Sequence, residues 1–170
     1  VCIVISDVTR RWQSPETYLP ILVAELEAAG IRDEDMLIIS ATGTHRRQTP
    51  EEHVGLVTQA VYDRIRLVDH QCTEEEQLAY VGTTTRGTPV YLDRRVLACD
   101  KVILTGGVVY HFMAGFGGGR KSILPGIAGR ETIMKNHNLA LNPGLGNGSN
   151  PAVRSANMNE TNPVHADMME

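Results

Sequence analysis

The chain has 170 residues, of which 42% are hydrophobic and 21% charged, and its net charge at pH 7 is −4. That length suits one domain with a sizeable core. The slightly acidic balance favours neither nucleic acid nor an anionic membrane surface as a partner, and no apolar run is long enough to span a bilayer. Cys2, Cys72 and Cys99 form no paired framework, so we expect free thiols in a cytoplasmic protein.

The first half of the chain alternates apolar runs with capped helical segments. Ser14-Pro15 supplies a cap and a first-turn proline, and Thr49-Pro50-Glu51-Glu52 forms a capping box. The apolar runs are short and almost wholly hydrophobic, as in buried parallel strands. We therefore predict strands at 1–6, 36–40 and 65–69, and helices at 16–29 and 50–64.

The second half carries weaker signals. Candidate strands at 78–81 and 90–92 flank the polar run Thr83–Thr88. This run could be a ligand loop, but we favour a hairpin connection. The remaining predicted elements are a helical turn at 93–98, a buried strand at 101–106 and a helix at 127–136.

The last segment reads as a linker. Residues 138–162 are rich in Asn, Gly and Pro, which predicts a loop, and Asn162-Pro163 then marks the start of a helix. Because the chain opens without Met in an apolar run and stops just after this helix start, we expect a fragment or excised domain of a longer protein. Residues 1–137 would form its α/β domain, and residues 138–170 a loop or linker with the start of a helix.

Strand–helix alternation with short connections predicts the α/β class. The expected architecture is a mostly parallel sheet flanked by helices, a Rossmann-like layer sandwich. In such folds ligands bind beyond the carboxyl ends of the strands.

Polar loops follow three of the predicted strands. They are Asp7-Val8-Thr9-Arg10, Thr42-Gly43-Thr44-His45-Arg46 and the segment from Gly106 to His111. The first could be a simple turn, or an anion clamp in which Arg10 offers a planar fork. The second could be a solvated surface loop, but we favour a chemical role for His45. Because the three loops share one sheet edge, we predict that they form one pocket.

Two other histidines are expected to lie outside this pocket. His53 falls in a predicted helix and His70 at a strand end, and neither has an evident polar partner in the sequence. We therefore interpret both as isolated side chains.

A glycine-rich loop runs from Gly115 to Ser122. Glycines let the backbone approach an anionic ligand closely, and Lys121 could serve as a phosphate-binding charge or as a nucleophilic amine. An arginine separates the last glycine from Lys121, and Pro125-Gly126 precedes the next helix, so a P-loop NTPase is disfavoured. Phosphate binding of another kind stays open.

His111 and His137 lie on either side of this loop. Their spacing does not fit compact zinc motifs. A metal here would be held by few protein ligands, together with a cofactor that supplies its own donor atoms.

Together these residues resemble the nickel-dependent lactate racemase family, over essentially the whole chain and as its amino-terminal domain. Each block is weak alone, but their order and spacing are specific. The matching blocks are Asp7-Val8-Thr9-Arg10, Thr42-Gly43-Thr44-His45-Arg46, Thr49-Pro50-Glu51-Glu52, Gly82-Thr83-Thr84, His111, Gly115-Phe116-Gly117-Gly118-Gly119-Arg120-Lys121, Pro125-Gly126, Asn136-His137 and Asn162-Pro163-Val164-His165.

The resemblance implies a nickel pincer nucleotide, a pyridinium mononucleotide whose two sulfur atoms and ring carbon hold Ni(II). By this resemblance Lys121 would be joined to the cofactor through a thioamide, and His137 would be the fourth nickel ligand. Asp7, Thr9 and Arg10 would help to bind the nucleotide.

His45 and His111 would then be the acid/base pair of a racemase or epimerase acting on lactate or a related 2-hydroxy acid. The reaction implied is hydride transfer to and from the cofactor. The resemblance implies a fragment of a two-domain protein, in which residues 1–137 would be the cofactor-binding and catalytic domain and residues 138–170 would lead to an absent second domain. The implied partners are the 2-hydroxy acid, the second domain and cofactor-synthesis proteins, and residues 1–170 alone are expected to be inactive.

Two other functions stay open. A nucleotide- or phosphate-binding hydrolase would use the glycine-rich loop and Lys121. A noncatalytic nucleotide- or metal-binding module would explain the glycines and His137, but not the two further histidines at strand ends.

Overall fold

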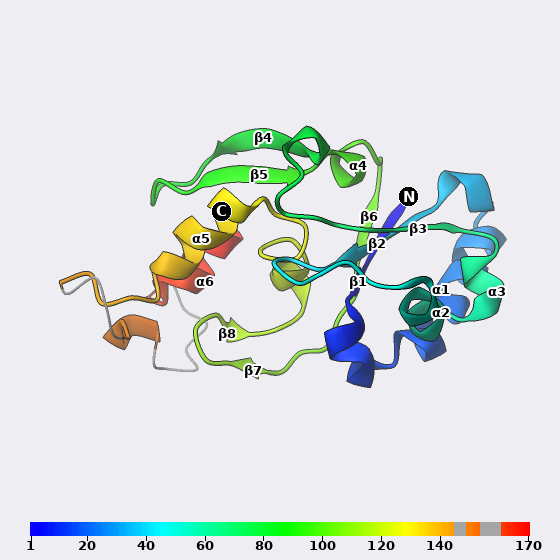
Figure 1. The fold of residues 1–170 in the computed structure, drawn as a ribbon, viewed down its shortest axis with the longest axis horizontal. Helices are drawn as coiled ribbons and strands as arrows, with labels where there is room; N and C mark the ends of the chain where they lie inside the picture. The colour runs from blue at the N-terminus through cyan, green and yellow to red at the C-terminus, as the bar shows by residue number, and fades with distance from the viewer. Residues whose placement is uncertain (145–148, 154–160) are drawn as a thin grey trace.

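A four-stranded parallel sheet with strand order β3-β2-β1-β6 forms the centre of the fold, which confirms the predicted α/β class (Figure 1). The computed structural model describes residues 1–144, 149–153 and 161–170. The strands of this sheet are β1 (Cys2–Ser6), β2 (Leu37–Ala41), β3 (Arg66–Asp69) and β6 (Val102–Leu104).

Both faces of β1 are buried, as its unbroken apolar sequence predicts. Ile3 and Ile5 pack with residues of α1 (Pro15–Ala28), α2 (Pro50–Val57) and α3 (Gln59–Tyr62) in one core cluster. Cys2 and Val4 pack in a second cluster with Val96 of α4 (Arg94–Leu97). Alternate residues of one strand point to opposite faces, so β1 forms the centre of a layered core.

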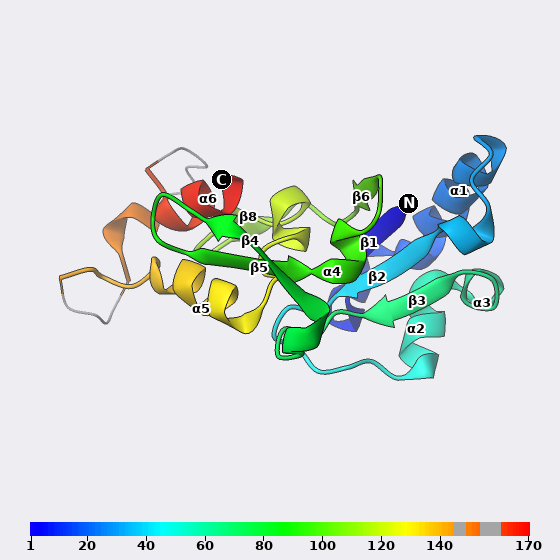
Figure 2. The same cartoon turned by 90° about the horizontal axis from the view of Figure 1, so that it is seen from above.

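An antiparallel hairpin and the two last helices lie at the other end of the molecule from α1 and α3 in both views (Figures 1 and 2). The strands β4 (Leu78–Thr83) and β5 (Pro89–Asp93) pair as an antiparallel hairpin, which confirms Thr83–Thr88 as its connection. Helices α5 (Arg130–Asn138) and α6 (Pro163–Met169) contact each other beside it. The buried carboxylate of Asp167 joins all three elements, since it accepts hydrogen bonds from Thr84, Thr88 and Asn136.

Two predicted helices have different bounds in the structure. The helix expected at 50–64 is broken at Thr58, whose φ is +72° and which lies next to a second β-branched residue, Val57. The helix expected at 127–136 begins only at Arg130. The reason is tertiary: the carbonyl groups of Ile127 and Ala128 accept hydrogen bonds from Asp93 and His70 instead of from a helical turn.

The sequence also did not predict several short elements. These are the 3₁₀ segments η1 (Val8–Gln13), η2 (Asp33–Asp35), η3 (Glu75–Gln77), η4 (Gly119–Ser122) and η5 (Pro151–Val153), and the hairpin of β7 (Tyr110–His111) with β8 (Gly115–Phe116).

The predicted helix start at Pro163 is confirmed, with Asn162 capping the backbone amides of Val164 and His165. The predicted loop at 138–162 is irregular over most of its described part, apart from η5, while 145–148 and 154–160 lie outside the described residues. Within the described ranges, no helix is both long and apolar enough to cross a membrane.

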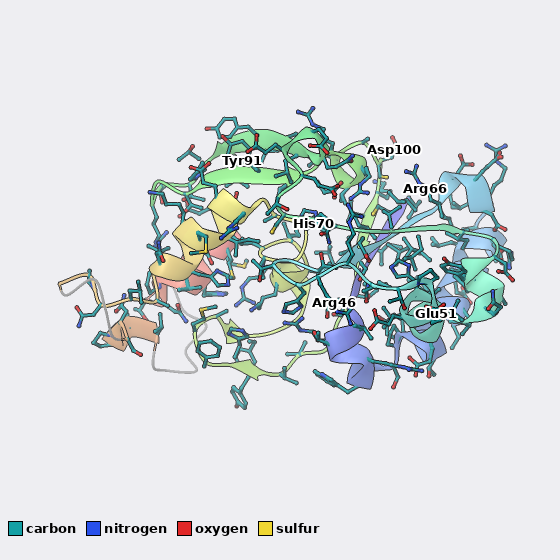
Figure 3. The ribbon with its side chains drawn as sticks, in the orientation of Figure 1. Arg46, Glu51, Arg66, His70, Tyr91 and Asp100 are labelled. Atoms are coloured by element: carbon teal, nitrogen blue, oxygen red, sulfur yellow. The ribbon has the colours of Figure 1, made fainter. Side chains whose placement is uncertain are left out.

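The interpretation of His53 and His70 as isolated side chains was wrong. His53 Nε2 lies 2.8 Å from Asp69 Oδ1. His70 is fully buried near the centre of the molecule (Figure 3), with Nδ1 2.9 Å from Asp93 Oδ2 and Nε2 2.9 Å from the carbonyl oxygen of Ala128. Burial of a polar ring is costly without such partners, and these come from elements distant in sequence.

Candidate active site

The three polar loops meet at the carboxyl edge of the sheet and line one pocket, as predicted. The pocket lies where β1, β2 and β6 end, and its accessible volume is about 200 Å³. This edge includes the boundary between β1 and β6, from which the chain connections leave in different directions, a common ligand position in α/β sheets. The lining residues include Arg10, Thr44, His45, Gly107, His111, Gly117, Gly118, Lys121 and His137.

Asp7 organises the first loop. Its side chain is 1% exposed and caps η1 by accepting hydrogen bonds from the amide and the hydroxyl of Thr9, at 3.1 and 2.5 Å. Its other carboxylate oxygen pairs with Nδ1 of His45 from the second loop. A carboxylate can only accept, so the Nδ1 atom of His45 carries the proton, and Nε2 keeps its lone pair when the ring is neutral.

Hydrogen bonds of the Gln48 side chain hold the loop that carries His45 in place. The side chain of Gln48 accepts from the amide of Val8 at 2.7 Å and donates to Ser40 and Asp69 at 2.8 and 2.7 Å. These bonds link η1, β2 and β3 through one side chain. Gln48 therefore positions the two loops that bring Asp7 and His45 together.

His111 sits at the start of a tight turn between β7 and β8. Its Nδ1 atom accepts hydrogen bonds from the backbone amides of Met113 and Ala114, at 3.3 and 3.2 Å. Its Nε2 atom lies 2.9 Å from Nζ of Lys121. Burial, and then the charge of Lys121, lower the pKa of His111 to about 4.

Lys121 lies in η4, inside the pocket rather than on the surface. Burial, reinforced by the charges of Arg10 and Arg120, lowers its pKa to about 8. The turn η4 ends at Ser122 and α5 starts only at Arg130, so Lys121 is not placed at the head of a long helix as it is in a P-loop.

His137 reaches the same pocket from α5. Its Nδ1 atom is buried and has no hydrogen-bond partner of normal geometry among the described residues. Burial and the charge of Lys121 lower its pKa, while the backbone of Ile133 one turn earlier acts in the opposite direction. Because His137 lines the pocket, its imidazole is able to bind a metal or a ligand there.

Every titratable side chain that lines the pocket is basic: Arg10, His45, His111, Lys121 and His137. Burial, and then the positive charge of basic neighbours, lowers the pKa of His111, Lys121 and His137. A bound anion would relieve this repulsion, so the lining suits an anion. In the described part of the chain, no three His, Cys, Asp or Glu side chains converge as a metal-binding group.

Glycines make room for close backbone approach in this pocket. A Cβ atom on Gly107 would lie 3.1 Å from side-chain atoms of Trp12 and Gln13, and one on Gly117 would lie 3.2 Å from the carbonyl oxygen of Gly107. At Gly126 the constraint is stronger, since a Cβ would lie 2.2 Å from the carbonyl oxygen of Ser122. The glycine-rich sequence is therefore a packing requirement of the site.

The structure brings together six of the seven residues that the sequence singled out, with Asp7, His45, His111, Lys121, His137 and Arg10 at or against the pocket. Thr9 bonds to Asp7 and supports the loop instead of lining the pocket. The run Arg10-Arg11-Trp12-Gln13, where the sequence departs from the proline-rich continuation expected of the lactate enzymes, places Trp12 and Gln13 in the lining of the pocket. Sequence reasoning missed Gln48, and only its nearness in sequence to the His45 loop could have drawn attention to it.

Comparison with known proteins gives one consistent family. The family described as the lactate racemase N-terminal domain matches residues 1–148. The lactate racemase of Lactiplantibacillus plantarum is 34% identical to this chain over 169 residues, and that of Thermoanaerobacterium thermosaccharolyticum is 32% identical. Each match covers 99% of this chain and 38% of the relative, so the chain spans well under half the length of these curated relatives.

Solved structures agree on the fold. The lactate racemase apoprotein from Thermoanaerobacterium thermosaccharolyticum superposes with a TM-score of 0.84 at 32% identity, over 99% of this chain and 38% of that one. A protein from Thermotoga maritima gives a TM-score of 0.73 at 22% identity, over 98% of this chain and 41% of that one, and shows similarity of fold alone.

Proposed function

The chain belongs to the family of lactate racemase N-terminal domains, and we propose that it forms the cofactor-binding and catalytic part of a racemase or epimerase of a 2-hydroxy acid. The observation that carries the proposal is the convergence of His45, His111, Lys121 and His137 in one basic pocket. Lactate is the substrate named for the relatives, and a related 2-hydroxy acid has the same carboxylate and hydroxyl chemistry.

The pocket fits a nickel pincer nucleotide in three respects. The imidazole of His137 lines the pocket, and its Nδ1 atom faces away from solvent near the backbone of Ile133, so the ring is held with its other nitrogen available for a ligand. Gly107, Gly117 and Gly118 also line the pocket, so no side chain from these three positions takes up space within it. The lining is basic, which suits a nucleotide phosphate.

The proposed roles follow from position. Lys121 holds the cofactor covalently through a thioamide, and His137 is the one protein ligand of the nickel ion, for which imidazole is a suitable donor. Arg10, with Asp7 and Thr9 fixing its loop, binds the nucleotide. When bound, the cofactor would supply the hydride acceptor and donor that the reaction at the substrate carbon requires.

His45 and His111 supply the proton chemistry. A racemase must act on both faces of one carbon, so it needs a proton acceptor and donor on each side. His45, whose Nδ1–H is engaged by Asp7, presents Nε2 to take a hydroxyl proton from one enantiomer. His111 does the same for the other enantiomer after Lys121 has left its Nε2 atom for the cofactor and the ring proton has moved to Nδ1, a change that requires the contacts of Nδ1 with the Met113 and Ala114 amides to open. Asp7 acts through His45 and is a positioning residue.

The proposed function is tested by mass spectrometry and metal analysis of the full-length protein made together with cofactor-synthesis proteins. We expect one covalent adduct that maps to Lys121 and is lost in Lys121→Ala. Nickel should fall well below one equivalent in His137→Ala. Lys135→Ala is the matched control, because Lys135 is exposed on the same helix as His137 and should leave both adduct and nickel unchanged. An adduct on another residue, or full nickel in His137→Ala, would contradict the assignment.

A further inference from the structure

The turn after His111 determines which of its ring nitrogens carries a proton. Two backbone N–H groups, from Met113 and Ala114, point at Nδ1. An amide can only donate, so Nδ1 must accept and cannot carry a proton. The single proton of the neutral ring is therefore on Nε2, the atom that faces Lys121.

This tautomer fixes the direction of the contact with Lys121. Nε2 and Nζ are 2.9 Å apart, and a hydrogen bond between them needs one donor and one acceptor. Because Nε2 carries the proton, the acceptor is Nζ, and an ammonium group has no lone pair with which to accept. The reverse arrangement would place a third proton between Nδ1 and the two amides.

We infer that His111 holds Lys121 as an uncharged amine, by donating from Nε2–H to the lone pair of Nζ, so that Lys121 is a nucleophile before any cofactor is attached. His111 is thus a positioning residue for the amine as well as a member of the pocket.

The surroundings of Lys121 support this state. No ion pair of the described residues involves Lys121, and the charged or titratable groups that face the Lys121–His111 pair are Arg10, Arg120 and His137, all basic. Burial and the two arginines already lower the pKa of Lys121 to about 8, and the hydrogen bond to its lone pair acts in the same direction.

An amine in this state is able to form the bond that the cofactor needs. The lone pair of Nζ attacks a thiocarboxylate carbon, a C–N bond forms, and the oxygen leaves as water with one proton from the amine and one from solvent. The use of the amine for this attachment rests on the proposed function, whereas its uncharged state does not.

The first test reads the tautomer directly, in full-length protein purified from cells without the cofactor-synthesis proteins. Long-range ¹H–¹⁵N correlation of ¹⁵N-histidine protein at pH 9, above the pKa of Lys121 of about 8, with His111 assigned by loss of its signals in His111→Phe, should show Nε2 protonated and Nδ1 bare. A proton on Nδ1, in either the other neutral tautomer or an imidazolium, would overturn the inference.

The second test reads the amine in the same protein. A limiting amount of the N-hydroxysuccinimide ester of acetic acid acylates free amines, and peptide mapping gives the rate at each site. Lys101 and Lys135 are both exposed and serve as internal references. The Lys121 rate should rise with a midpoint near pH 8. In His111→Phe the ratio of Lys121 to Lys101 acylation at pH 7 should fall roughly tenfold, the factor that one ordinary hydrogen bond is worth.

An unchanged ratio in His111→Phe, with unchanged Lys101 and Lys135 rates, would overturn the inference. Both tests use cofactor-free protein, so their outcome is separate from that of the proposed function. A reactive Lys121 in the cofactor-free protein, together with no adduct in cells that make the cofactor, would refute the proposed function alone.

Discussion

At the residue scale, the two histidines of the pocket present opposite hydrogen-bonding atoms. His45 has its proton on Nδ1, which faces Asp7, so its Nε2 atom is a free acceptor. His111 has Nδ1 held by two backbone amides, so its Nε2 atom is a donor. Local partners set each state, a carboxylate in one loop and a tight turn in the other. In the cofactor-free protein, Nε2 therefore acts as a hydrogen-bond acceptor in His45 and as a donor in His111.

The depressed pKa of Lys121 makes a prediction for the stability of the cofactor-free protein. A lysine whose pKa in the folded state is about 8, below its ordinary value of 10.5, penalises the folded state at pH values below 8. That penalty disappears as the pH rises from 8 to 10.5. The difference in free energy of unfolding between Lys121→Met and the wild type should therefore shift in favour of the wild type over this range.

Urea unfolding of both proteins at intervals from pH 6.5 to 10.5 measures this difference, and Lys135→Met, an exposed lysine, should show no comparable trend. A difference that stays constant with pH, or that moves towards the variant, would mean that the pKa of Lys121 is not lowered by folding.

At the element scale, the carboxyl ends of β1, β2 and β3 are joined through Gln48. Replacing Gln48 by Met keeps the length of the side chain but leaves the Val8 amide without its acceptor and removes the donor to Ser40. Asp69 loses one donor and keeps its bonds to His53 and to the backbone amide of residue 48. We expect a loss of about 2 kcal/mol in the free energy of unfolding, the usual cost of leaving such groups without partners.

Gln59→Met is the matched control, because its side chain bonds to Asp63 on an exposed surface. It should change stability by no more than about 0.5 kcal/mol. Denaturant unfolding compares the two variants, and equal effects would mean that Gln48 does not hold the loops together.

The elements themselves were largely predictable, and the exceptions have physical causes. The strand Cys2–Ser6 and the helix start at Pro50 follow from local signals, an apolar run and a capping box. The late start of α5 at Arg130 was not predictable, because the carbonyl groups before it bond to β5 and to His70.

The candidate site was predictable for a different reason. Parallel strands end at a common edge, so polar residues that follow β1, β2 and β6 must lie near one another, whatever the details of the loops. What the sequence could not indicate were the pairings, such as His45 with Asp7 and His111 with Lys121, or the support from Gln48. These depend on loop conformations that no local pattern encodes.

At the scale of the whole molecule, the pocket is basic although the chain carries a net charge of −4. The cations gather where the loops of η1, β2, β7 and η4 meet, at the edge of the sheet between the α1–α3 end and the β4–β5 end (Figure 1). The negative net charge of the chain repels an anion, whereas the basic pocket at this edge of the sheet attracts one. This distribution agrees with a carboxylate substrate and a phosphate-bearing cofactor.

The central claim is that His45 and His111 act on opposite faces of one substrate carbon. It is tested by single-turnover formation of the 2-keto acid from each enantiomer separately, in cofactor-loaded full-length His45→Ala and His111→Ala. Each variant should lose racemisation by about 10²–10⁴-fold, the usual contribution of a positioned proton carrier. Each should still oxidise the enantiomer that its remaining histidine reaches, so the two variants should prefer opposite enantiomers. The same preference in both variants would contradict a site with one base on each face.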